Sequence, residues 1–332
     1  MREARMCRRY IYVFVITGCW PAHAQSTGWA ELTRQGRSLQ AQSRFREAES
    51  AFQSALEEAE RTSGAAEQQA TSLFDLAVIK VDLGMMAEGA RLCQRSASLL
   101  AQTAGESNPQ LEVVRTRLAE LYLDSGQLRT ATTLLRQVIG AQEKASQTAT
   151  LPGARALDAL ACVYARQRKF GAARKLERRA LSILESRSGE GELSLAITSL
   201  HLSMFLDAAG HPAEGLIHAE RAAQILKRLP VVEPFVRADS SRNLASLYVS
   251  LGRREDAETP SREAMELVER AYGPDHFYTG WMLLARAAIL RRLGRGSEAE
   301  AAQHRGEGIL TAQSQRDRLG YTVPMSALLP PR

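Results

Sequence analysis

The side chains that could carry out acid–base, nucleophilic or metal chemistry are few in this sequence and widely spaced. The histidines are dispersed, and none stands in the H-E-x-x-H spacing that brings two imidazoles to one metal ion. His211 and His218 could share a helix face two turns apart, but two imidazoles alone are too few ligands for a metal site. The sequence also contains no P-loop, glycine-rich phosphate turn or G-x-S-x-G motif. We therefore predict no catalytic residue, no metal site and no cofactor.

The cysteines give no metal or redox motif either. Cys7 and Cys19 stand in the first 24 residues, and Cys93 and Cys162 are far apart in the chain, so no C-x-x-C pair occurs. A cysteine in a helical protein commonly serves as a small buried hydrophobe. We therefore predict that Cys93 and Cys162 are core residues and not ligands.

The elements that position these side chains follow from an internal repeat. Similar segments begin at Leu76, Leu118, Leu160, Leu202 and Leu244, each with a small residue next and a turn eight residues on. The turn positions are Ser43, Gly84, Gly126, Arg168, Gly210, Gly252 and Gly294, which are 41 residues apart once and 42 residues apart five times. So regular a period indicates a repeat architecture of about seven units.

Small residues flank every turn at fixed distances. Seven residues before the turns stand Gly36, Ala77, Ala119, Ala161, Ser203, Ala245 and Ala287, and five residues after them stand Ala48, Gly89, Ala131, Ala173, Gly215, Ala257 and Ala299. Two helices joined by a tight turn can cross closely only where the contact residues are small. Apolar residues at helical spacing surround these positions. Each unit is therefore predicted to be a helix–turn–helix hairpin, and the fold class is all-α.

This pattern resembles the tetratricopeptide repeat (TPR), and its period is similar to that of the 42-residue variety found in kinesin light chains. Tyr122, Tyr164 and Tyr248 stand four residues before their turns, and the segment 271–277, AYGPDHF, is similar to the loop between repeats of that subfamily. The resemblance covers residues 29–312 and implies a right-handed α–α superhelix. Ser43 and Arg168 depart from it where glycine is expected at the turn.

The resemblance further implies that a protein or peptide partner would bind in a concave groove lined by the first helix of each repeat. Peptide-binding members carry asparagine and basic residues there, whereas here only Asn243, beside Arg242, has the expected amide. The other groove candidates are Arg117, Glu120, Asp124, Arg155, Arg166 and His201. Because the pattern that grips a terminal carboxylate is absent, we do not expect that activity. The alternative is that these side chains are solvated and hold no ligand.

The N-terminus has the pattern of a signal peptide over residues 1–24. Arginines precede an apolar run, residues 10–20, that is too short to span a bilayer. The segment 16–19, ITGC, favours a lipoprotein with lipid on Cys19, whereas AHA at 22–24 favours cleavage between Ala24 and Gln25. We favour the second, because it uses the whole apolar run and a helix-breaking proline before the cut. An exported bacterial protein, periplasmic or secreted, is expected; a lipid tether or, with a mis-assigned start, a cytoplasmic protein are the alternatives.

The charge of the chain excludes a nucleic-acid partner. The net charge is +6, but residues 1–24 hold four arginines and one glutamate, and removing them leaves 39 basic and 36 acidic residues, a net charge of +3. Interleaved signs at this level do not make a phosphate-binding patch. No stretch outside the leader approaches the length of a transmembrane span.

The C-terminal tail, residues 313–332, breaks the helical pattern. Its prolines, Pro324, Pro330 and Pro331, prevent a continuing helix. We expect an extended strap over the apolar face of the last repeat, since solenoid ends need capping. The alternative is a linear motif that another protein binds.

These observations favour a non-catalytic scaffold for protein–protein interaction. One alternative is a solenoid enzyme or ligand-binding protein with a polar site in the groove, which Glu120, Asp124 and Arg166 would provide. The other is a cytosolic regulatory TPR module. A binding fold does not by itself name the partner.

Overall fold

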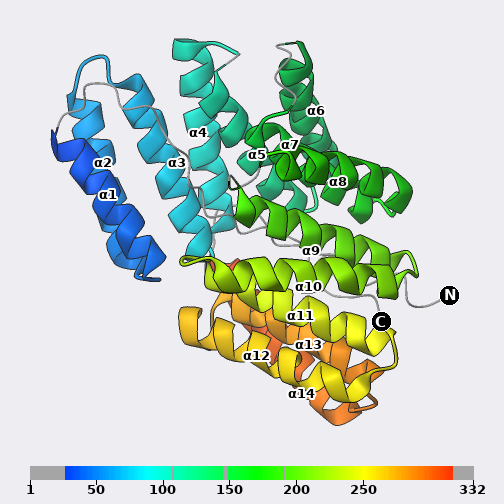
Figure 1. Cartoon of the computed structure of the whole chain (residues 1–332). Coiled ribbons are helices and arrows are strands. Elements are labelled where there is room, and N and C mark those ends of the chain that lie inside the picture. Colours follow the sequence, from blue (N-terminus) through cyan, green and yellow to red (C-terminus); the bar gives the residue numbers. More distant parts are fainter. Residues whose placement is uncertain (1–26, 107, 145–148, 188, 190, 317–332) are drawn as a thin grey trace.

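We describe the protein from a computed structural model, which describes residues 27–106, 108–144, 149–187, 189 and 191–316. The predicted signal peptide, with Cys19, Ala24 and Gln25, and residues 317–332 of the predicted strap lie outside the described residues. Within these ranges the chain forms fourteen α-helices and no strand (Figure 1).

The helices alternate as first and second members of seven hairpins. They are α1 (Thr27–Ala41) with α2 (Phe45–Arg61), α3 (Ala66–Asp82) with α4 (Met86–Ala104), α5 (Pro109–Asp124) with α6 (Leu128–Lys144), α7 (Leu151–Arg166) with α8 (Phe170–Glu185), α9 (Glu192–Ala208) with α10 (Pro212–Arg228), α11 (Pro234–Ser250) with α12 (Arg254–Tyr272), and α13 (Phe277–Arg292) with α14 (Gly296–Arg316). The fold is the all-α solenoid of helix–turn–helix repeats that the sequence predicts.

Each hairpin turns at a residue in the left-handed backbone region. Positive φ angles occur at Ser43, Gly84, Gly126, Arg168, Gly210, Gly252 and Gly294. At Gly84 the angle of 80° lets the next residue donate its N–H to the carbonyl of Lys80 at 2.8 Å, which ends α3. Ser43 and Arg168 adopt the same conformation, at 58° and 62°, although their side chains make it less favourable. The two repeats that lack the turn glycine therefore keep the same turn geometry.

Several first helices begin at residues that cap them. At α5 the side-chain oxygen of Asn108 accepts the backbone N–H groups of Gln110 at 2.8 Å and Leu111 at 3.1 Å. Pro109 takes the first helical position, where its missing N–H costs little. Thr150 caps α7 through its hydroxyl oxygen. These local signals fix where the hairpins start.

The small residues that flank the turns let the two helices of a hairpin touch through their backbones. A Cβ atom added at Gly215 would lie 2.8 Å from the carbonyl oxygen of Ser203, and one added at Gly89 would lie 2.9 Å from that of Ala77. In both pairs the residue five after the turn meets the residue seven before it. The helices of repeats two and five therefore approach more closely than an alanine at these glycines would allow.

We expect Gly215→Ala to lower the free energy of unfolding by about 1–3 kcal/mol, because the new methyl group must push α10 away from α9. Gly308→Ala is the matched control, since a Cβ atom there meets nothing within 4 Å in the middle of α14. That variant should instead gain about 0.5–1 kcal/mol from higher helix propensity. Denaturant unfolding of both variants measures the two effects, and a Gly215 variant as stable as the wild type would contradict the close crossing.

The superhelix brings its first repeats back onto its last ones. The Nε2 atom of His276 lies 2.8 Å from the carbonyl oxygen of Asp82, and the ring of Phe45 stacks on Tyr272 with centroids 5.4 Å apart. His276 also caps α13, where its Nδ1 accepts the N–H of Tyr278 at 3.2 Å, so Nε2 is the atom that carries the proton and donates. We call these pairs, Phe45–Tyr272 and Asp82–His276, the closure contact.

The core is built mainly from alanine, leucine and other aliphatic side chains. One cluster of buried residues runs from Ala70 in α3 to Val236 in α11, so most repeats share a continuous core. Cys93 and Cys162 are both fully buried within it, as free thiols. No helix in the described part of the chain has the length and hydropathy needed to cross a bilayer.

Candidate functional site

Polar side chains link the first helix of one repeat to the first helix of the next. The links are Arg37 to Asp75 at 3.1 Å, Glu120 to Arg155 at 3.2 Å, Asp158 to His201 at 2.6 Å, Ser203 to Asn243, Asp207 to Ser246 at 3.4 Å and Ser250 to Arg292 at 2.9 Å. We call this set the polar ladder. Because its partners stand about one repeat apart in sequence, the ladder fixes the register of repeat one on repeat two and of repeats three to seven on one another.

One step of the ladder is a buried ion network in repeats three and four. Glu120 is completely buried, and its Oε2 atom accepts a hydrogen bond of 3.2 Å from the guanidinium group of Arg117. Arg155 donates to both oxygens of Glu120, from Nε at 3.2 Å and from its terminal nitrogen at 3.3 Å. Burial lowers the pKa of Arg117, but the attraction of Glu120 and of smaller neighbouring charges together outweighs burial and holds that pKa above its ordinary value. Such a network is stable only as a whole, since each charge depends on the other.

The structure places the remaining groove candidates along the ladder and does not bring all of them to one point. Arg242 donates to Asp239 at 2.6 Å and lies over the ring of Trp281, 5.4 Å from its centroid. Asn243 is buried and donates to Ser203.

The last two candidates stand at the ends of their helices. Arg166 reaches the carbonyl oxygen of Leu123 at 3.4 Å. Asp124 is half-buried. Burial of Arg117 and the charge of Glu120 have the larger effects on the pKa of Arg117, and the charge of Asp124 raises it further. These side chains therefore contribute to packing between repeats.

His201 takes part in a compact buried cluster with Asp158, Cys162 and Glu177. Each of the four residues offers one ligand atom, and these atoms all lie within 4.8 Å of one another. Asp158 and Cys162 are one turn apart on α7, Glu177 comes from α8 and His201 from α9. Burial raises the pKa of Glu177 well above its usual range, and the neighbouring charge of Asp158 raises it further.

The geometry of this cluster does not fit nucleophilic catalysis by Cys162. A Cys–His–Asp relay needs the thiol on one ring nitrogen and the carboxylate on the other. Here the thiol sulfur, at 3.6 Å, and the carboxylate of Asp158, at 2.6 Å, both approach Nδ1 of His201. One nitrogen cannot accept the thiol proton while it donates to the carboxylate.

The sequence prediction missed Glu177, although the repeat contains a signal for it. Glu177 stands nine residues after its turn, and the corresponding residues of the other repeats are Phe52, Cys93, Leu135, Ala219, Ser261 and Gln303. The first five of these are buried, so the position belongs to the core. A glutamate at a core position requires a partner for its charge. Aligning the repeats on their turns would have identified it.

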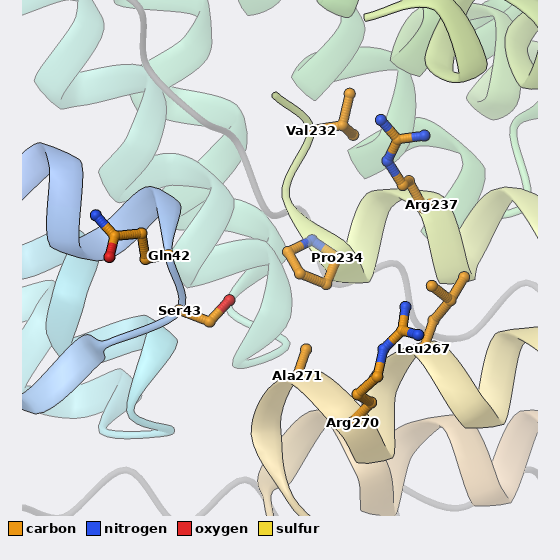
Figure 2. Close-up of a pocket in the computed structure, with 8 residues that line it drawn as sticks. All are labelled: Gln42, Ser43, Val232, Pro234, Arg237, Leu267, Arg270 and Ala271. Carbon is orange, nitrogen blue, oxygen red and sulfur yellow. The ribbon is translucent and has the colours of Figure 1, made fainter. Parts of the chain in front are cut away.

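A separate cleft of about 530 Å³ opens beside the closure contact, between repeat one and repeat six (Figure 2). Its walls are Gln42 and Ser43 from the first turn, Val232, Pro234 and Arg237 from the start of α11, and Leu267, Arg270 and Ala271 from the end of α12. The cleft therefore joins segments that are distant in sequence, which is why the repeat pattern did not reveal it.

Two arginines give the cleft its charge. Arg237 donates to the carbonyl oxygen of Leu229 at 3.0 Å, and Arg270 is exposed. Among the described residues no carboxylate forms an ion pair with either of them. The cleft thus offers two guanidinium groups beside the apolar side chains of Val232 and Leu267.

Comparison with known proteins supports the repeat. Residues 154–191 and residues 236–310 each match a family model described as the tetratricopeptide repeat. No curated protein matches the chain.

Several solved structures have a similar fold. BtubC (BKLC) from P. vanneervenii is 19% identical with a TM-score of 0.54, over 69% of this chain and 92% of that one. A Rap protein complexed with competence and sporulation factor is 13% identical with a TM-score of 0.68, over 88% and 78% of the two chains. NprR with its cognate peptide NprX is 12% identical with a TM-score of 0.63, over 87% and 81%. Two segments of this chain are thus matched by the tetratricopeptide repeat, within an all-α solenoid of the kind seen in these structures.

Proposed function

We propose that this protein is a non-catalytic scaffold that binds an extended segment of a partner protein, and that an acidic part of the segment binds in the cleft between repeats one and six. The observation that carries the proposal is the pair Arg237 and Arg270. Both guanidinium groups border an open cleft, and no described carboxylate neutralises them. The ladder residues, in contrast, already bind one another.

The chemistry of the cleft suits a peptide better than a small polar ligand. Guanidinium groups bind carboxylates through paired hydrogen bonds. The apolar surfaces of Val232, Pro234 and Leu267 would hold the aliphatic part of the same segment. Two solved structures of similar fold, the Rap protein with competence and sporulation factor and NprR with its cognate peptide NprX, are complexes, which favours a peptide-like ligand here as well.

A displayed library of random peptides, selected on the immobilised full chain, tests this proposal. We expect enriched peptides to be acidic, and Arg237→Ala/Arg270→Ala to weaken their binding about tenfold or more, because two charge-assisted contacts are lost. Arg262→Ala/Arg291→Ala removes the same charge from exposed arginines outside the cleft and should bind as the wild type does.

The same selection also tests the groove. Arg242→Ala/Asn243→Ala changes two groove candidates, of which Asn243 belongs to the ladder, and should keep peptide binding if the variant is folded, as circular dichroism would show. Loss of binding in the folded ladder variant, with full binding in the cleft variant, would move the site to the groove and contradict our proposal. A library that yields no binder would contradict the scaffold itself.

We also propose that the chain is exported and cleaved between Ala24 and Gln25. The support is the pattern of arginines, apolar run and small-residue site in residues 1–24. Mass spectrometry of the mature N-terminus from cell fractions tests the proposal. A mature chain that begins at Gln25 is expected, whereas an acylated Cys19 would make the protein a lipoprotein, and an intact leader on a cytoplasmic chain would contradict export.

A further inference from the structure

The cluster of Asp158, Cys162, Glu177 and His201 has no place in the proposed peptide site. Its members lie in the wall of repeats four and five and are 0–5% exposed. Positions equivalent to Asp158, ten residues before the turn, hold Phe74, Thr116, Leu200, Arg242 and Leu284 in other repeats. The hairpin therefore does not need a carboxylate there, and the cluster calls for an explanation of its own.

The cluster contains more negative charge than its protein partners balance. The Oδ1 atom of Asp158 forms a hydrogen bond with Nδ1 of His201. The Oδ2 atom of Asp158 and both carboxylate oxygens of Glu177 have no hydrogen-bond partner. Two ionised carboxylates this close inside a protein are costly. They can share a single proton, which forms one hydrogen bond between them, or they can bind a cation.

One spacing between the donor atoms matches that of a four-coordinate cation, and all four atoms lie within 4.8 Å of one another. In a tetrahedral Zn²⁺ site with bonds of about 2.0–2.3 Å, a sulfur and a nitrogen ligand stand about 3.5 Å apart. The distance from Cys162 Sγ to His201 Nδ1 is 3.6 Å. The contact of 2.6 Å between His201 and Asp158 is a hydrogen bond and would have to open to about 3.3 Å when both bind the ion.

We propose that Asp158, Cys162, Glu177 and His201 together bind one Zn²⁺ ion that joins α7, α8 and α9. The ion supplies the positive charge that the two carboxylates lack. A mixed set of one thiolate, one imidazole and two carboxylates suits Zn²⁺ better than Mg²⁺ or Ca²⁺, which prefer oxygen ligands only. Four protein ligands close the coordination sphere, so the site is structural and leaves no position for a substrate.

Metal titration of the full chain, after chelation and dialysis, tests the site. We expect one Zn²⁺ per chain and a higher Tm in its presence, because the ion binds only the folded state. Co²⁺ in its place should give a charge-transfer absorption from the Cys162 thiolate. Cys162→Ser is expected to abolish that absorption and to weaken Zn²⁺ binding by at least about tenfold.

The chain provides its own control, Cys93→Ser. Cys93 is equally buried but lies outside the cluster, and burial raises the pKa of its thiol to about 12. This variant should bind Zn²⁺ and Co²⁺ as the wild type does. Equal loss of the absorption in both serine variants, or equal Zn²⁺ binding in the wild type and Cys162→Ser, would place the metal elsewhere and overturn the proposal.

Glu177→Gln separates a metal site from a shared proton. The amide keeps the shape of the side chain and can donate to Asp158 while removing one negative charge. We expect the metal-free variant to have a higher Tm than the metal-free wild type and to gain nothing from Zn²⁺. A wild-type chain that binds no Zn²⁺, with the same increase in Tm for Glu177→Gln, would show that the carboxylates only share a proton and would refute the ion.

Discussion

Glu120→Ala is expected to lower the free energy of unfolding by about 3–5 kcal/mol. Glu120 is the carboxylate to which both Arg117 and Arg155 donate, and it is completely buried. Alanine would leave Arg117, itself 1% exposed, without its closest negative charge. It would also remove the ladder step between repeats three and four, from Arg155 to Glu120. Denaturant unfolding followed by circular dichroism measures the loss.

Two further variants show whether burial causes this effect. Glu120→Gln keeps the shape and one acceptor oxygen, so its loss should be smaller than that of alanine. Glu266→Ala breaks the pair with Arg262, 3.6 Å apart on the surface of α12, where the two side chains are 69% and 56% exposed. Exposed pairs of this kind contribute little, and we expect a change within about 0.5 kcal/mol. If Glu120→Ala cost no more than Glu266→Ala, the network would not stabilise the fold.

Acidification from pH 6.5 to pH 4 is expected to destabilise the wild type relative to His276→Asn by about 2–3 kcal/mol. Burial lowers the pKa of His276 to about 4, although its hydrogen bond to Asp82 acts in the opposite direction. The folded state therefore binds fewer protons than the unfolded state between the ordinary pKa of 6.5 and a pKa of about 4. The contribution of the neutral His276 to the free energy of unfolding is therefore full above about pH 6.5 and is lost as the pH drops toward about 4.

The comparison with His276→Asn isolates this histidine from other titrating groups. Burial raises the pKa of Asp82 to about 6, so that carboxyl takes up its proton over the same range and favours the folded state as the pH drops. Asp75 does the same, for the same reason. Both effects are present in the two chains and cancel in the difference. Asparagine still caps a helix, because its side-chain oxygen can accept the N–H that Nδ1 of His276 accepts. Parallel pH profiles of Tm for the two chains would contradict the buried neutral imidazole.

The fold could be predicted because its causes are local and repeat along the chain. Small residues at two positions and a turn residue between them are enough to set a hairpin, and the contact between Gly215 and Ser203 shows why they must be small. Arg168 shows how much context adds, since it takes a left-handed conformation that its residue type does not favour.

The sites were harder to predict because they depend on geometry that accumulates over several repeats. Glu177 could have been found by aligning core positions, as its repeat partners are buried. The cleft and the closure contact could not have been found in this way, because Phe45 meets Tyr272 at the end of α12 only through the pitch of the whole superhelix. Small rotations at every repeat decide that pitch, and no motif encodes it. The groove candidates were chosen by position alone, and their pairing along the ladder depends on the same rotations.

The closure contact changes how the chain should fold and unfold. In an open array each repeat touches only its neighbours, so the ends can fray while the middle stays intact. The hydrogen bond between His276 and Asp82 joins residues 194 positions apart in sequence, so repeat seven contacts repeat two and the array is closed on itself. Because closing so long a loop requires repeats three to six to be in place, we expect this step to come late in folding. Fraying at repeat seven would then loosen repeat two, so native-state hydrogen exchange should show the two protected to a similar degree.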